Sequence, residues 1–107
     1  MVTALFRSRD NCVCGFLIKG HADYGEYGND IVCAAVSSAV YLVANTITEI
    51  VHGDCKIVEK DGYFSLSMRE YSGTASAMLD GLRLHLTELS KDYPQFVTIT
   101  TEVLDNA

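Results

Sequence analysis

The sequence lacks tryptophan and has a single proline, and its eight lysines and arginines are outnumbered by fourteen aspartates and glutamates. The formal charge of -6 argues against the basic patch that nucleic-acid-binding domains carry, so we expect no direct nucleic-acid partner. An acidic chain instead favours encounter with a basic protein or peptide. Because aromatic residues make up only 9% of the chain, aliphatic side chains must supply most of the core.

Uninterrupted apolar runs and closely paired cysteines are also missing. The longest apolar stretch, residues 31–51, contains serine, threonine, asparagine and glutamate, which makes it a poor membrane span and predicts a buried helix instead. Residues 1–10 contain two arginines and no apolar segment of the signal-peptide type, so we expect a cytoplasmic protein without a membrane partner. The four cysteines form no Cys-x-x-Cys pair, and thiols are the default state in that compartment.

The length and composition predict one domain over residues 1–107. Apolar residues make up 49% of the chain and charged residues 21%, which is typical of a globular protein. Hydrophobic periodicity predicts helices at about 30–51 and 72–93, and strands at 2–7, 13–19, 56–60, 63–68 and 97–103. The dipeptide Asp61-Gly62 predicts a hairpin turn, and Pro94 ends the second helix. The predicted fold class is α+β, ordered β-β-α-β-β-α-β, with one mixed sheet packed against two helices.

The candidate chemistry lies between Gly20 and Ser38, where a glycine-rich segment precedes the first predicted helix. Asp30 or Asn29 is a good N-cap, and a cap at Asp30 would place Cys33 at the third helical position, in the first turn. The backbone N–H groups and the positive end of the helix dipole there stabilise a thiolate and can receive an oxyanion. His21 can reach the thiol if the segment folds back, as the base of a Cys–His pair does. The ordinary alternatives are a buried structural cysteine and a loop histidine with a backbone partner.

Other residues of this segment have a structural alternative beside the functional one. Asp30 can cap the helix, orient His21, or do both, and Ser37, one turn after Cys33, can touch substrate or bond to its own helix. The glycines allow turns or loop motion, and the tyrosines can form a pocket for aromatic residues or simply pack. Together they form a candidate substrate loop: Gly20, Tyr24, Gly25, Tyr27 and Gly28.

A metal site is a competing interpretation of the same segment. His21, Asp23, Asp30 and Cys33 are of ligand-forming types, but their spacing matches no common zinc pattern. We therefore expect neither a metal nor another cofactor.

The run from Gly20 to Ser37, GHADYGEYGNDIVCAAVS, resembles the signature of the ribosomal-processing cysteine protease family, Prp. That signature is Gly-His-Ala, a glycine-rich spacer, and Asp-Ile-Val-Cys-Ala-Ala-Val-Ser, and the chain is similar to the family in length and element order as well. The resemblance implies a cysteine endopeptidase with Cys33 as nucleophile and His21 as general base. The resemblance further implies that the substrate is a large-subunit ribosomal protein of the bacterial L27 family. Its N-terminal extension would be removed by a cut after an aromatic residue. The resemblance also implies that the enzyme is a homodimer.

A non-enzymatic ribosome-associated adaptor protein is the alternative function, because small size and surface acidity permit it. The two hypotheses differ in the surface that they require at Cys33. A cleft of substrate size would favour the protease, and a flat surface would favour the adaptor.

Overall fold

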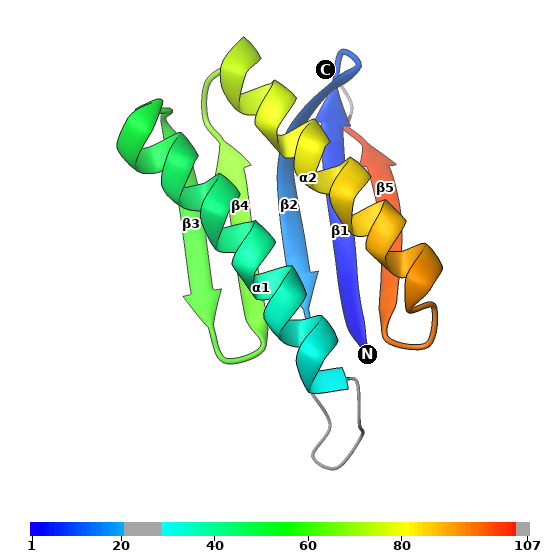
Figure 1. Cartoon of the computed structure of the whole chain (residues 1–107). Helices are drawn as coiled ribbons and strands as arrows, with labels where there is room; N and C mark the ends of the chain where they lie inside the picture. The colour runs from blue at the N-terminus through cyan, green and yellow to red at the C-terminus, as the bar shows by residue number, and fades with distance from the viewer. Residues whose placement is uncertain (21–28, 105–107) are drawn as a thin grey trace.

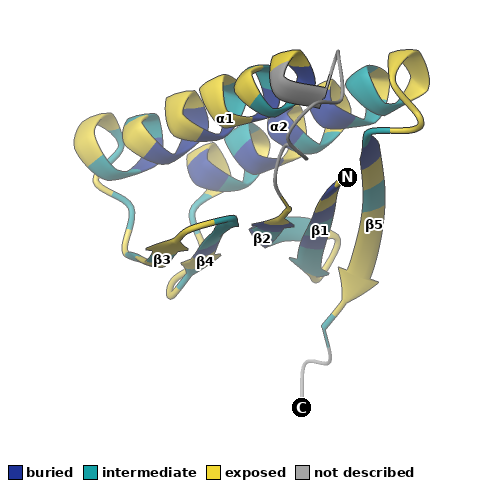
Figure 2. Ribbon diagram, turned by 90° about the horizontal axis from the view of Figure 1, so that it is seen from below, coloured by how far each residue is buried: buried dark blue, intermediate teal, exposed yellow. Residues whose placement is uncertain are grey.

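The structure is a computed structural model that describes residues 1–20 and 29–104. Within these residues, two long helices lie side by side on one face of a five-stranded sheet, and no described element covers the other face (Figures 1 and 2). The elements in chain order are β1 (Val2–Arg9), β2 (Cys12–Lys19), α1 (Asn29–Asn45), the π-helical turn η1 (Thr46–Ile50), β3 (Cys55–Lys60), β4 (Tyr63–Met68), α2 (Gly73–Asp92) and β5 (Val97–Val103). This arrangement confirms the predicted α+β class and the predicted element order.

Two tight turns build the sheet from hairpins. Asp10 and Asn11 join β1 to β2 with φ angles of 55° and 63°, a left-handed conformation that asparagine and aspartate tolerate better than most residues. Gly62 has a φ of 69° in the turn between β3 and β4, which explains why the predicted Asp61-Gly62 turn needs a glycine at its second position. The turn chemistry in the sequence therefore fixes two of the four strand pairings.

The remaining two pairings join segments that are distant in the sequence. The strand order is β3-β4-β2-β1-β5, with β2 antiparallel to β4 and β1 parallel to β5. Alternate strand residues face the helices, and with the inner faces of α1 and α2 they form one core. Its largest fully buried side chains are Phe6, Phe16, Val32, Ile47, Leu66, Leu79 and Leu86.

Helix α1 is buried on one side only, so the prediction of a largely buried helix is wrong for its outer side. Val32, Val36 and Val40 face the sheet, whereas Ile31 and Leu42 are exposed by 58% and 68%. The segment is apolar on most sides, but one five-stranded sheet and one neighbouring helix can cover only part of its surface. By length and composition, the stretch Ile31–Ile50 would suffice to cross a membrane, a property that core helices of soluble proteins share.

Helix α2 follows the predicted pattern closely. The Ser72 hydroxyl caps its start by accepting a hydrogen bond from the Ala75 N–H at 3.2 Å. Ala75, Leu79 and Leu86 are fully buried along its inner face, as the predicted apolar stripe requires. Helix α2 thus packs its inner face into the core, and α1 is the helix that lines the cleft described below.

Candidate functional site

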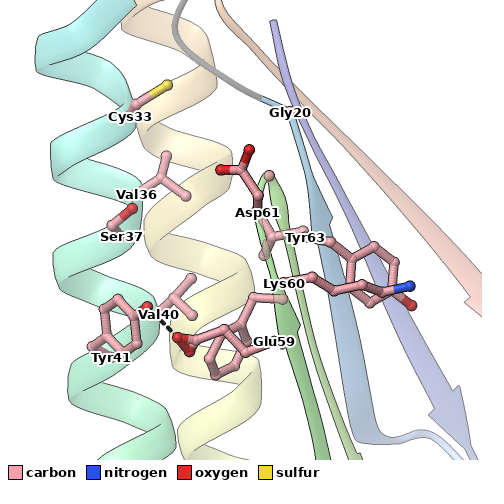
Figure 3. A pocket seen from close by; sticks show the side chains of 13 residues that line it. Gly20, Cys33, Val36, Ser37, Val40, Tyr41, Glu59, Lys60, Asp61 and Tyr63 are labelled. Atoms are coloured by element: carbon pink, nitrogen blue, oxygen red, sulfur yellow. Dashed lines mark hydrogen bonds between the residues drawn. The ribbon is translucent and has the colours of Figure 1, made fainter.

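A cleft of about 580 Å³ lies between α1, the end of β2 and the β3–β4 hairpin (Figure 3). Helix α1 forms one wall and the hairpin forms the other. The described residues that line it are Ile18, Gly20, Cys33, Val36, Ser37, Val40, Tyr41, Glu59, Lys60, Asp61, Gly62, Tyr63 and Phe64. A volume of this size is typical of sites that enclose a small ligand or part of a peptide.

Cys33 lies at one end of this cleft. It is the fifth residue of α1, because the helix begins at Asn29. The prediction of an N-cap at Asp30 or Asn29 is therefore wrong, because these are the first two residues of the helix, and Cys33 is its fifth residue and not its third. Aspartate is favoured both at the cap and in the first turn, so the sequence does not separate the two positions. Helical Cα–Cβ bonds tilt toward the N-terminus, so the half-buried Cys33 thiol lies over the first turn, whose N–H groups have no partner within the helix.

The wall formed by α1 is a single face of the helix. Val36, Ser37, Val40 and Tyr41 follow Cys33 at spacings of three, four, seven and eight residues, and Figure 3 shows them in a row along the helix. At a rise of 1.5 Å per residue, the row from Cys33 to Tyr41 is about 12 Å long. Ser37 thus lies in the cleft one turn from Cys33, which is compatible with the predicted supporting role and does not test it.

The end of β2 meets the hairpin at Gly20. Its N–H donates a hydrogen bond to the carbonyl oxygen of Gly62 at 3.0 Å, and its φ is +123°, in a region that favours glycine. A Cβ atom at this position would lie only 2.1 Å from the backbone oxygen of Met1. This position of the cleft therefore requires glycine for a steric reason that the sequence did not reveal.

Tyr41 and Glu59 join the two walls at the end of the cleft that is distant from Cys33. The Tyr41 hydroxyl donates a hydrogen bond of 2.8 Å to Oε1 of Glu59, which belongs to β3 (Figure 3). This hydrogen bond to the Glu59 carboxylate raises the pKa of Tyr41, and burial and the negative charge of the carboxylate act in the same direction. The phenol consequently remains protonated and donating over the whole neutral range.

Sequence reasoning missed Tyr41, Glu59 and the apolar wall provided by Phe64. A signal for Tyr41 was present, because it shares a helix face with Cys33 and Ser37 at intervals of four residues. No comparable signal exists for Glu59 and Phe64, since their place opposite α1 depends on how the β3–β4 hairpin packs.

The edge of the hairpin that faces α1 is acidic. Glu59 and Asp61 extend toward the cleft, whereas the Lys60 side chain is directed away from α1, with its Nζ 4.9 Å from the ring centre of Tyr63 (Figure 3). The alternation of side chains along β3 separates Lys60 from Glu59, and Asp61 follows in the turn.

Several predicted site residues lie outside the described part of the chain. They are His21 and Asp23, together with four residues of the candidate substrate loop, Tyr24, Gly25, Tyr27 and Gly28. For Asp30, the structure describes only the backbone. Among residues 1–20 and 31–104, no three histidine, cysteine, aspartate or glutamate side chains gather as metal ligands would. The metal interpretation depended on His21 and Asp23 as well, so it remains a question for experiment.

The other three cysteines lie away from the cleft. Cys12 and Cys14 line a second pocket, of about 460 Å³, at the opposite end of β2, and the Cys14 thiol donates to the carbonyl oxygen of Arg7 at 3.5 Å. Burial raises the pKa of the Cys55 thiol, which the Arg69 guanidinium opposes and the Asp54 carboxylate reinforces. Of the four thiols, Cys33 is the one that the structure places in the cleft.

Comparison with known proteins gives concordant results from sequence and structure. A protein of Bacillus subtilis strain 168, ribosomal processing cysteine protease Prp, is 28% identical over 105 residues, which cover 92% of this chain and 94% of that protein. The structure of the ribosomal processing protease Prp of Staphylococcus aureus in complex with a substrate peptide superposes with a TM-score of 0.87 at 25% identity, covering 95% of this chain and all of that one. SMU.848 of Streptococcus mutans superposes with a TM-score of 0.82 at 28% identity, covering 97% and 96%.

The family comparison extends over almost the whole chain. The family model described as cysteine protease Prp matches residues 1–98, which include every strand and helix up to the start of β5. The chain therefore belongs to the Prp family of cysteine proteases.

Proposed function

We propose that this chain is a cysteine endopeptidase that removes the N-terminal extension of a large-subunit ribosomal protein of the bacterial L27 family, by a cut after an aromatic residue. The observation that carries the proposal is the thiol of Cys33 at one end of an elongated cleft whose walls carry both apolar and polar side chains. A cleft at this thiol, rather than a flat surface, favours the protease over the adaptor.

The dimensions of the cleft suit an extended peptide. About 12 Å separate Cys33 from Tyr41 along α1, and an extended chain advances about 3.3 Å per residue, so three to four residues can lie between the thiol and the far end. Ile18, Val36 and Phe64 offer apolar contacts to their side chains. Supporting evidence comes from the S. aureus protease Prp, which has been crystallised with a substrate peptide and with a covalently linked product peptide.

In the proposed reaction, Cys33 is the nucleophile and His21 the general base. His21 takes the thiol proton, and Sγ of Cys33 attacks the carbonyl carbon of the scissile bond. When the C–N bond breaks, the imidazolium returns the proton to the departing amine and a thioester remains on Cys33. A water molecule that gives its proton to His21 then attacks the thioester, which releases the new carboxyl terminus and restores the thiol.

The first turn of α1 is suited to stabilise the tetrahedral intermediates. Its N–H groups lack partners within the helix, and the helix dipole adds positive potential where the oxyanion forms beside Cys33. In this proposal, Asp30 orients His21, and Ser37, one helical turn after Cys33, contacts the substrate. The reaction needs no metal, because each proton transfer is carried out by His21.

Charge and assembly complete the proposal. A net charge of -6 and the acidic edge at Glu59 and Asp61 suit a basic ribosomal protein. We propose a homodimer in the cytoplasm, where ribosomes assemble; exposed apolar side chains on the outer side of α1, such as Leu42, support self-association.

The test is a cleavage assay with the full chain. Purified protein is incubated with the L27-family protein of the same organism, carrying its N-terminal extension, and the products are located by mass spectrometry. One cut after an aromatic residue, absent with Cys33→Ala, is expected. Intact substrate after prolonged incubation, or equal cleavage by Cys33→Ala, would overturn the proposal. Light scattering of the same sample measures the oligomeric state, and a monomer at assay concentration would contradict the dimer.

A further inference from the structure

The outer face of the sheet is basic, although the chain as a whole is acidic. No described element covers this face (Figure 2). Side chains alternate along a strand, so the neighbours of the buried Phe6, Phe16 and Leu66 point outward. The strand register aligns one outward row across all five strands, which consists of Lys60, Tyr63, Lys19, Thr3 and Thr98. A second outward row, at the other end of β3, consists of Lys56, Ser67, Gly15, Arg7 and Glu102.

The lysines of this face have no carboxylate partners among the described residues. Lys19, Lys56 and Lys60 are exposed, and none of them forms a salt bridge within the part of the chain that the structure describes. Glu102, the one acid in the two rows, pairs with Arg7 at 3.6 Å. Three cations elsewhere each have a carboxylate within 3.1 Å, namely Arg69, Arg83 and Lys91. The outer face thus presents three ammonium groups to an external anion.

The three lysines surround a group of hydroxyls. Lys60 and Lys19 lie two strands apart, about 10 Å, and Lys56 lies four residues from Lys60 along β3, about 13 Å. Figure 3 shows the Lys60 side chain directed away from α1, toward the Tyr63 ring. Strand β4 runs between the lysines of β3 and that of β2, and its outward residues all carry hydroxyl groups: Tyr63, Ser65 and Ser67.

We propose that the outer face of the sheet binds RNA through its sugar–phosphate backbone. Lysines and the hydroxyls of serine, threonine and tyrosine are the groups that contact phosphate and sugar oxygens. Serine and threonine hydroxyls can also bond to the ribose 2′-hydroxyl, which distinguishes RNA from DNA. A protein partner fits this face less well, because lysine and serine are depleted in protein–protein interfaces. Tyr63 is the one aromatic residue of the two rows, so we expect little preference for particular bases.

This inference revises the expectation, drawn from net charge, that nucleic acid is not a partner. The net charge of -6 does not show that the cations gather on one face, whereas the strand register does. The inference does not depend on the proposed peptidase function. The cleft at Cys33 lies between α1 and the hairpin, on the helix side of the sheet, so RNA on the outer face leaves it open.

The test measures how RNA binding depends on salt. Fluorescence anisotropy of a labelled single-stranded RNA of mixed sequence is recorded with the full chain between about 50 and 200 mM salt. Three to four phosphate contacts predict a slope of log K against log salt of about -2 to -3, which is a loss of roughly 20- to 50-fold in affinity over this range. Lys19→Gln and Lys56→Gln should each weaken binding and make the slope less negative by about 0.7, and the double variant by about 1.4.

Lys91→Gln is the matched control for these variants. It removes the same charge from α2, on the other side of the sheet, and Lys91 is as exposed as the lysines that are tested. The affinity and the salt slope of Lys91→Gln should equal those of the wild type. Lys56 lies outside the cleft, so Lys56→Gln should cleave the ribosomal substrate at the wild-type rate and thereby show that it is folded.

Several results would overturn the inference. They are the absence of RNA binding at about 50 mM salt, or an equal loss of affinity in Lys56→Gln and Lys91→Gln, which would show that net charge alone acts. DNA of the same sequence that binds as tightly as RNA would refute the assignment to RNA, and a poly-glutamate peptide that binds more tightly would indicate an acidic protein partner instead. Because cleavage and RNA binding are measured separately, failure of either proposal leaves the other standing.

Discussion

Replacement of Gly20 by alanine tests whether the backbone at the end of β2 is as constrained as the structure indicates. Gly20 has a φ of +123°, and an added Cβ would lie 2.1 Å from the Met1 carbonyl oxygen and 3.1 Å from the Cα of Val2. These neighbours are backbone atoms, so no flexible side chain can rotate out of the way. Gly20→Ala therefore requires the end of β2 and the start of β1 to separate.

The cost follows from two separate effects. A non-glycine residue held in a sparsely populated region of φ and ψ loses about 1–3 kcal/mol. An added carbon in a tightly packed place, which forces the backbone to shift, costs about 1–3 kcal/mol more. We expect Gly20→Ala to lower the free energy of unfolding by roughly 2–6 kcal/mol, a large part of the ~5–15 kcal/mol that holds a typical domain together.

Gly81→Ala is the matched control for this substitution. Gly81 lies within α2, and an added Cβ would have no neighbouring atom within 4 Å. Alanine forms helix better than glycine, so Gly81→Ala should raise the free energy of unfolding by about 0.5–1 kcal/mol. The same chemical change is thus expected to have opposite signs at the two positions.

The assay combines urea unfolding with cleavage kinetics. Urea denaturation gives the free energies of all three proteins, and kcat/KM is measured at a temperature at which each is folded. Because Gly20 directly precedes His21, the proposed base, we expect Gly20→Ala to lower kcat/KM even when fully folded. A Gly20→Ala protein within about 0.5 kcal/mol of wild type would show that the close approach to Met1 is not real. Unchanged kcat/KM would show that Gly20 does not position His21.

Three further predictions concern the thiols and metal dependence. Cys33→Ala should abolish cleavage without lowering the urea midpoint by more than a small amount, whereas Cys55→Ser should retain turnover; cleavage by Cys33→Ala would disprove the mechanism. Incubation with a chelator should leave kcat/KM unchanged, and a loss that zinc restores would establish a metal site. Burial raises the pKa of the Cys55 thiol, so its alkylation should be slow at neutral pH and should accelerate only above the pKa of an unfolded cysteine. Because folding favours the protonated thiol, the free energy of unfolding should fall as the pH rises through that pKa. Rapid alkylation of Cys55 at pH 7 would contradict this prediction.

Local chemistry in the sequence predicted the elements well but not all their neighbours. The Asp61-Gly62 turn and the apolar stripe of α2 are short-range signals, and the structure confirms both elements. The strand order could not be predicted, because the pairing of β2 with β4 and of β1 with β5 joins segments more than 40 residues apart in sequence. Such pairings depend on how the strands and helices bury their apolar faces together, which no local pattern encodes.

The candidate site shows the same division. Cys33 and Ser37 were predicted from one helix, and the structure places both in the cleft. The opposite wall, with Glu59 and Phe64, was not predicted, because nothing in the β3–β4 hairpin marks it as the neighbour of α1. The helix begins one to two residues earlier than a cap at Asn29 or Asp30 predicts, since aspartate suits both the cap and the first turn.

The aromatic contacts suggest why so small a domain can maintain a defined cleft. A wall made only of surface side chains would open in local fluctuations that leave the core intact. Here the line from Phe6 through Phe16 and Phe64 to Tyr41 connects the far end of the cleft to the most buried part of the sheet. Tyr41 is itself 43% exposed, so moving its ring costs its edge contact with Phe64 and its hydrogen bond to Glu59, whereas displacing Phe64 would disrupt the packing of the core. The end of the cleft near Cys33 has no such aromatic connection among the described residues, so the two ends of one cleft are expected to differ in rigidity.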